Sequence, residues 1–444
     1  MSRFAFGLWL GFGMFAGTLA VASAQDTVRL AEKFDANEPY RVELKVSASG
    51  KITAPIGPEK QLVTVAMTGS GTTVYDEHIL PPDDSKADRV IRVYRDVEFR
   101  RTIGDRDQKA DIRPNVRRMI VLRSEKGKKA PFSPDGPLAW GEIDVVSKDV
   151  FSPTLIPGLL PVKPVRPGDT WTVSPAAVAD LTDLDPVDEG TIGATFVSLV
   201  TLEGRRYAKL TIAGTVKGST EDGPTRQKLD GTAYFDLEVD RLSYLNLKGV
   251  QEMLGPDGKV LGRIDGTFVM ERRSAGKVAE LAPDALRGVD LKPTPENSLL
   301  LYENPDLGVK FLYPRRWRVG IVQGRQVALE EPQGGGLLLT VEPPSGLPTA
   351  AQFQKETQDF LRQQKWTFSV ADAPKRVAER PGWVDRFGFD AELKAKVRME
   401  YAVVTFAEGG ATVAARLPAA AKGELTPDFE RIVRSVQLTK RIEK

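Results

Sequence analysis

The sequence predicts an α+β protein of two domains, a large antiparallel β-sheet followed by a smaller domain that mixes antiparallel strands with helices. Three observations lead to this expectation. Apolar and polar residues alternate in successive segments from Tyr40 to Arg273, as in strands with one wet face. A stretch rich in Ala, Pro and charge follows at residues 274–298, and helical patterns join the strand patterns beyond Leu299. At 444 residues the chain is also too long for one ordinary core.

The composition is that of a soluble globular protein, with 41% hydrophobic and 27% charged residues. The formal net charge of +2 creates no overall field that would attract nucleic acid, so we expect no nucleic-acid partner. The sequence contains no cysteine, which excludes disulfides and a lipid-modified cysteine anchor.

Residues 1–24 have the pattern of a signal peptide. Arg3 precedes the apolar run Phe4–Val21, and Ala22-Ser23-Ala24 forms an A-x-A cleavage site. We therefore expect a mature chain from Gln25, a periplasmic or secreted location, and no membrane-spanning segment after cleavage. Because the run is long for a signal peptide, an uncleaved anchor is the alternative.

The first domain is expected to occupy residues 25–273. Its first half shows strand patterns separated by turn residues, at Tyr40–Ala48, Gln61–Met67, Arg89–Phe99, Met119–Leu122 and Leu138–Val146. A proline-rich hinge follows, and then a short helix at Pro175–Leu181 with Ser174 as its N-cap. Five strands in meander order complete the domain, at Ile192–Leu202, Tyr207–Lys217, Leu229–Val239, Leu242–Leu254 and Val260–Glu271.

Two segments of this domain carry a resemblance. The run Leu160-Pro161-Val162-Lys163-Pro164-Val165-Arg166-Pro167-Gly168-Asp169-Thr170-Trp171, with Gly231–Leu237 later, resembles a bacterial exported domain family of unknown function. The resemblance implies a large curved sheet, similar to the open barrels of lipoprotein-carrier proteins.

Residues 274–298 are expected to form a proline-rich linker to a second domain at residues 299–440. Strands are expected there at Val309–Tyr313, Val327–Glu330, Leu337–Glu342, Thr367–Val370, Trp383–Phe389, Lys396–Phe406 and Ala411–Leu417. One helix is expected at Ala350–Gln364 with Thr349 as its cap, and a second from Thr426-Pro427-Asp428.

The order of these elements is similar to the Mog1/PsbP-like fold, an antiparallel sheet between helices. Tyr313-Pro314, Trp317 and the closing Ser435-Val436 carry the resemblance over most of residues 299–440. Members of this fold mostly bind proteins, and the resemblance transfers no catalytic residue.

The sequence lacks most of the residues and motifs that catalysis commonly uses. His78 is the only histidine, and no Gly-x-Ser-x-Gly motif would expose a nucleophile. Gly334-Gly335-Gly336 leads into a strand and so indicates a hairpin rather than a phosphate-binding loop. We expect no enzyme activity, no cofactor and no metal, although the acidic loop Asp183–Glu189 leaves Ca²⁺ binding open. Paired carboxylates of a hydrolase cannot be selected from 60 acidic residues.

One segment is strongly basic. Fourteen basic and six acidic residues lie between Arg89 and Lys129, a local excess of eight positive charges. A solvated sheet face is the ordinary explanation, and contact with an anionic surface is the functional one. The residues predicted for such contact are Arg89, Arg92, Arg95, Arg100, Arg101, Arg117 and Arg118.

The hypothesis from the sequence is an exported, non-catalytic binding or scaffold protein of the bacterial cell envelope, whose partner is a protein or an anionic envelope component. The alternative is a periplasmic carrier that holds an apolar ligand, such as a lipid, in the concave face of the first sheet. A carrier requires an apolar cavity of several hundred Å³. A scaffold would have that face filled by its own side chains.

Overall fold

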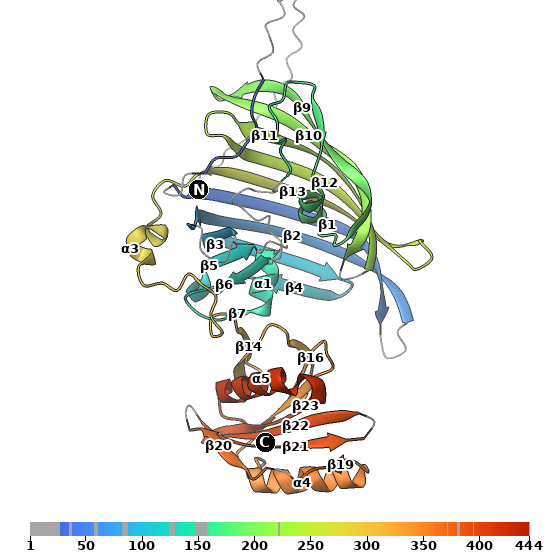
Figure 1. Ribbon diagram of the computed structural model, residues 1–444, viewed down its shortest axis with the longest axis vertical. Helices are drawn as coiled ribbons and strands as arrows, with labels where there is room; N and C mark the ends of the chain where they lie inside the picture. Colours follow the sequence, from blue (N-terminus) through green and yellow to red (C-terminus); the bar gives the residue numbers. More distant parts are fainter. Residues whose placement is uncertain are drawn as a thin grey trace, which may run out of the picture.

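The computed structural model describes residues 27–34, 38–56, 61–81, 88–123, 129–147, 158–220, 223–370, 372–379, 382–393 and 395–443. Within them the protein is mostly β, with one very large antiparallel sheet and two smaller sheets (Figure 1). The predicted signal peptide lies outside the described residues. Among the residues described, no helix is both long and apolar enough to cross a membrane.

Twelve described strands form the large sheet, in the order β6-β5-β3-β2-β1-β13-β12-β11-β10-β9-β8, with β4 paired to β3. The sheet is open, because β6 and β8 occupy its two ends and do not pair with each other. Its strands are β1 (Tyr40–Ile56), β2 (Gln61–Ile79), β3 (Asp88–Ile103), β4 (Arg106–Ala110), β5 (Arg118–Arg123), β6 (Lys129–Phe132), β8 (Thr170–Thr172), β9 (Val187–Leu202), β10 (Arg205–Thr220), β11 (Gly223–Asp236), β12 (Arg241–Leu254) and β13 (Val260–Ser274).

The predicted meander from β9 to β13 is confirmed, and the sheet is large and antiparallel as expected. The sequence did not predict that β13 would return to pair with β1, where Leu44 lies opposite Met270. Most strands also extend further than the alternation indicated. Glycines permit close approach between these long strands: a Cβ on Gly50 would lie 2.0 Å from the carbonyl oxygen of Arg263.

One face of the large sheet, here called the inner face, carries Tyr40, Val42 and Leu44, and other parts of the chain cover it around these residues. Two helices lie over it, α1 (Trp140–Ser147) and α2 (Pro175–Thr182) (Figure 1). The N-cap prediction is confirmed, since the Ser174 hydroxyl accepts the Ala177 N–H. Buried side chains from α1, α2, β1 and β10 belong to one continuous apolar core.

The opposite, outer face carries a smaller core. Ile91, Val93 and Ile120 from β3 and β5 pack there against Val278 and Leu281. Val278 and Leu281 come from the stretch 274–298, which contains a 3₁₀ turn at Ala279–Leu281 and the short helix α3 (Pro283–Leu286). Part of the predicted linker therefore packs on the first sheet instead of crossing solvent.

The predicted strand Leu138–Val146 is wrong. Only β7 (Leu138–Ala139) is extended, and α1 begins at Trp140. The physical reason is the Glu142 carboxylate, which reaches back to accept the Ala139 N–H at 2.7 Å and caps the helix from its first turn.

The second half contains an eight-stranded antiparallel sheet and a four-stranded sheet. The eight-stranded sheet has the order β16-β17-β18-β23-β22-β21-β19, with β20 paired to β21, and the smaller sheet has the order β24-β15-β14-β7. Their strands are β14 (Leu300–Asn304), β15 (Val309–Tyr313), β16 (Arg318–Gln323), β17 (Gln326–Glu330), β18 (Gly336–Glu342), β19 (Thr367–Phe368), β20 (Lys375–Ala378), β21 (Trp383–Glu392), β22 (Lys396–Phe406), β23 (Gly409–Pro418) and β24 (Gln437–Leu438).

Two helices lie on opposite faces of the eight-stranded sheet, α4 (Ala350–Gln363) and α5 (Lys422–Ser435) (Figure 1). The predicted arrangement of an antiparallel sheet between helices is confirmed, as is the Thr349 cap, whose hydroxyl accepts the Gln352 N–H. The predicted start of α5 at Thr426 is wrong. The helix begins at Lys422 because its added first turn buries Leu425, although Pro427 then lies inside the helix.

The two halves of the chain are joined through β7. This two-residue strand from the first half pairs in parallel with β14 of the second half, with Leu138 beside Leu300 and Ala139 beside Leu301. Arg315 strengthens the junction by donating to the carbonyl oxygens of Ser298 and Pro131. These contacts place α1 directly beside the smaller sheet.

Candidate functional site

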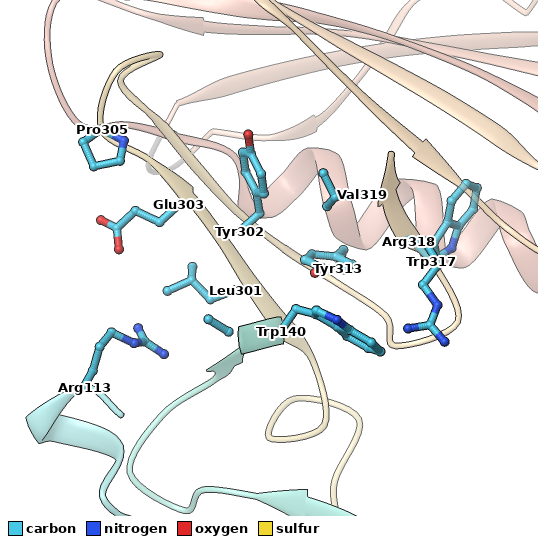
Figure 2. A pocket seen from close by; sticks show the side chains of 11 residues that line it. Arg113, Trp140, Leu301, Tyr302, Glu303, Pro305, Tyr313, Trp317, Arg318 and Val319 are labelled. Carbon is cyan, nitrogen blue, oxygen red and sulfur yellow. The ribbon is translucent and has the colours of Figure 1, made fainter. Parts of the chain in front are cut away.

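A cleft of about 460 Å³ lies at this junction (Figure 2). It forms where α1 turns away from β14 and leaves space between the two halves of the chain. Eleven described residues line it, and aromatic and basic side chains are prominent among them: Arg113, Ala139, Trp140, Leu301, Tyr302, Glu303, Pro305, Tyr313, Trp317, Arg318 and Val319.

The most exposed aromatic ring of the cleft belongs to Trp140, which is 43% exposed. The guanidinium carbon of Arg318 lies 4.1 Å from the centroid of this ring, a cation–π contact between the first half of the chain and the second. Trp140 is therefore held in place at the cleft while much of its ring stays open to solvent.

Glu142 fixes the first-half side of the cleft. Its carboxylate is buried and accepts hydrogen bonds from the Arg113 backbone N–H at 2.9 Å and from the Arg113 guanidinium at 2.7 and 2.8 Å. The same carboxylate caps α1 through Ala139. The side-chain hydrogen bond with Glu142 raises the pKa of Arg113. One carboxylate thus positions both Arg113 and the helix that carries Trp140.

The second-half side of the cleft is aromatic. Tyr302 stacks on Phe311 with ring centroids 4.9 Å apart, and Phe311 in turn contacts Tyr313. Burial raises the pKa of Tyr313 to about 12, so its phenol is neutral at physiological pH. Trp317 is fully buried and donates from Nε1 to Asp428 at 3.1 Å, so its ring closes the core of the second half.

This arrangement is suited to binding. Aromatic faces and a guanidinium plane accept apolar or flat groups through burial, stacking and cation–π contacts. Glu303 is exposed, and it is the one carboxylate among the described residues that line the cleft. It can orient a basic group next to the apolar surface.

The structure places the seven predicted arginines in different environments. Arg92 is fully buried on the inner face, where it forms an ion pair with Glu77 of β2 and lies 4.3 Å above the Tyr75 ring. The Tyr40 hydroxyl also donates to Glu77. The Arg92 guanidinium therefore serves the core and does not face an external surface.

Arg95, Arg117 and Arg118 come together on the outer face, where they line a cavity of about 470 Å³. Arg95 bonds to Asp76 at 2.7 Å and to Glu280 at 2.6 Å, whereas Arg118 pairs with Asp135. Arg117 donates to the Arg95 carbonyl oxygen at 3.3 Å. Arg95 thus lies on the face opposite to Arg92, and acidic neighbours balance much of the charge of this group.

The remaining three arginines lie apart from that group. Arg89 is buried and donates to the Pro81 carbonyl oxygen at 2.6 Å. Arg101 bonds to Gln108, and Arg100 is exposed near the end of β3. Arg92 is excluded from surface contact by its burial, and contact of the other six arginines with an anionic surface stays a prediction.

The acidic loop Asp183–Glu189 is spread along the chain rather than gathered. Asp183 caps α2 in a left-handed conformation, and Glu189 pairs with Lys217 of β10 at 2.7 Å. Across the part of the chain that the structure describes, no three His, Asp or Glu side chains come close enough to hold a metal ion.

No model of a known protein family matches the sequence, and no curated protein matches it. Among solved structures the chain is similar to cyanobacterial PsbP (CyanoP) from Synechocystis, at 16% identity over 32% of this chain and 92% of that one, with a TM-score of 0.26. It is also similar to lipovitellin, in a structure described for its lipid–protein interactions, at 9% identity over 56% of this chain and a TM-score of 0.32.

These likenesses are distant. The chain spans 27% of the length of lipovitellin, and both TM-scores are too low to support an argument about fold or function.

The sequence did not point to the cleft. The sequence pattern predicts a strand at Trp140, and nothing in the sequence distinguishes Arg318 from the other arginines. Tyr313 and Trp317 were identified only as markers of the second domain. The one available signal was Glu142, three residues after Ala139, which is the spacing of a helix cap.

Proposed function

We propose that this protein is an exported, non-catalytic binding protein of the cell envelope, and that it binds a protein partner in the junction cleft. The observation that carries this proposal is the aromatic lining of the cleft, where Trp140 is exposed and held by Arg318 from the other half of the chain, and Tyr302 is half-buried. Partly exposed aromatic and arginine side chains in a concave site are typical anchors of protein interfaces. The export component rests on the sequence of residues 1–24.

The part of the inner face that α1 and α2 cover is filled by side chains of the chain itself, which disfavours the carrier alternative there. Helix α2 lies over the end of this face, where Gln227 of β11 donates to the Thr182 carbonyl oxygen at 2.6 Å. Leu30, Leu159 and Val165 add further buried side chains to the same core. A hollow of about 480 Å³ does exist on β1, β13, β12 and β11, but it lies on the outer face and is lined by polar residues such as Ser47 and Lys248.

Site-specific cross-linking in the native host tests the proposal. p-Benzoylphenylalanine is placed at Val319 in the cleft and, as a matched control, at Val260 in the exposed hairpin between β12 and β13. The proposal predicts a defined protein adduct from position 319 that is absent at position 260. The partner, identified by mass spectrometry and purified, should bind the full chain in solution.

Two results would reject the proposal. One is equal cross-linking at both positions, and the other is a purified partner whose affinity is unchanged by Trp140→Ala. Native mass spectrometry of the same preparation checks the carrier alternative, because co-purified lipid would support a carrier.

A further inference from the structure

The strand β14 has an open edge inside the cleft. Its partner β7 covers only Leu300 and Leu301, because the chain leaves the sheet at Trp140 to form α1. Beyond that point β14 continues through Tyr302 and Glu303, and both residues line the cleft. A strand edge of this kind presents unpaired backbone groups to an incoming chain.

The hydrogen-bond pattern shows which backbone groups face the opening. Leu312 of β15 donates its N–H to the Ser435 hydroxyl at 2.8 Å and accepts from the same hydroxyl, so both groups point away from β14. Leu301, opposite Leu312, then directs its own N–H and C=O toward β7. By the alternation of an antiparallel ladder, Glu303 directs its N–H and C=O to the same side, past the end of β7.

The two sides of this edge differ in chemistry. Figure 2 shows Tyr302, Tyr313 and Val319 on one side of β14, and Leu301 and Glu303 on the other. A strand laid along the edge would send successive side chains to alternate sides. The residue opposite Glu303 would meet a carboxylate, and its two neighbours would meet the aromatic side.

We propose that an extended peptide segment of a partner protein adds as a strand to β14 at Glu303, with an apolar–basic–apolar sequence at the contact. The backbone N–H and C=O of Glu303 pair with the segment, its carboxylate pairs with the basic side chain, and the half-buried ring of Tyr302 receives an apolar one. Trp140 closes the end of the groove where β7 stops. This inference rests on the proposed binding function and names the form of the partner.

The test uses a displayed library of random heptapeptides against the full chain, followed by affinity measurements with a synthetic enriched peptide. We expect enrichment of apolar–basic–apolar sequences. The decisive comparison is Glu303→Pro against Glu303→Ala, since both remove the carboxylate and only proline removes the N–H. The strand should tolerate this proline because the N–H faces outward at an edge. Binding to Glu303→Pro should be about tenfold weaker than to Glu303→Ala.

Hydrogen exchange on the wild-type chain gives a second readout that does not depend on a variant folding. The Glu303 amide should exchange more slowly when the peptide is bound. Equal affinities of the two variants, an unprotected Glu303 amide, or a library without enriched peptides would each overturn strand addition. If cross-linking at position 319 persists in those cases, the cleft still binds a protein, and only the proposed strand addition to β14 is wrong.

Discussion

The guanidinium of Arg318 lies 4.1 Å from the ring centroid of Trp140 and so connects β16 of the second half to α1 of the first. Both residues also line the junction cleft. One contact therefore serves two purposes, since it ties the halves of the chain together and presents an aromatic face to a partner.

This contact should have a measurable coupling energy. A double-mutant cycle with Trp140→Ala and Arg318→Ala should give a coupling of about 0.5–1 kcal/mol, the range of partly exposed cation–π pairs. The free energies of unfolding come from urea titrations followed by circular dichroism. A cycle that combines Arg318→Ala with Trp383→Ala serves as control, because Trp383 is paired with Arg376 instead. Coupling near zero in the first cycle would contradict the role given to this pair.

Glu142 should stabilise the first-half side of the cleft, because it binds Arg113 and caps α1. Glu142→Ala removes the cap of α1 and leaves Arg113 without its carboxylate partner. We expect the free energy of unfolding to fall by about 2 kcal/mol. This is less than the loss for a fully buried ion pair, because the Arg113 side chain is partly exposed. Amide exchange of residues 139–146 should rise more than that of α2, which has no contact with this carboxylate. Uniform exchange in both helices would argue against a local role.

The buried pair of Arg92 and Glu77 should matter more for stability than the exposed basic residues of β3. Arg92→Ala leaves the Glu77 carboxylate buried without its ion pair and should cost about 3–5 kcal/mol. Arg100→Ala on the same strand should change the free energy of unfolding by less than about 0.5 kcal/mol, since Arg100 is exposed. Similar effects of the two substitutions on the free energy of unfolding would contradict this distinction between the buried Arg92 and the exposed Arg100.

The ion pair of Glu280 with Arg95 should make the packing of Val278 and Leu281 on the outer face sensitive to acid. The hydrogen bond from Arg95 lowers the pKa of Glu280 from 4.5 to about 2. Because the folded pKa is depressed, the stabilisation is complete above pH 4.5 and is lost as the pH falls from 4.5 toward 2. Amide exchange of Val278 and Leu281 should accelerate over this window, and Glu280→Gln should remove that dependence. If the pH dependence of amide exchange is the same in Glu280→Gln as in the wild-type chain, another titrating group causes it.

Local patterns predicted much of the fold. The strands Val309–Tyr313 and Lys396–Phe406 have the predicted bounds, because turn residues delimit each alternating run. The caps at Ser174 and Thr349 were also predictable, since each cap bonds within three residues.

The cleft could not be predicted, because distant contacts create it. The conformation of α1 depends on a carboxylate that also binds Arg113, and Trp140 meets Arg318 only after β7 joins β14. The basic segment illustrates the same limit. Its charge is visible in the sequence, but whether an arginine is buried, like Arg92, or exposed, like Arg100, depends on which strand lies beside it.

The central claim is that the junction cleft binds a protein partner. The most direct measurement is a calorimetric titration. The partner that cross-linking identifies is purified without the cross-link and titrated into the wild-type chain, Trp140→Ala and the surface control Lys259→Ala. We predict that Trp140→Ala weakens the affinity at least about tenfold, as expected for an aromatic anchor, and that Lys259→Ala leaves it unchanged. Equal affinities for the wild-type chain and Trp140→Ala would contradict the claim.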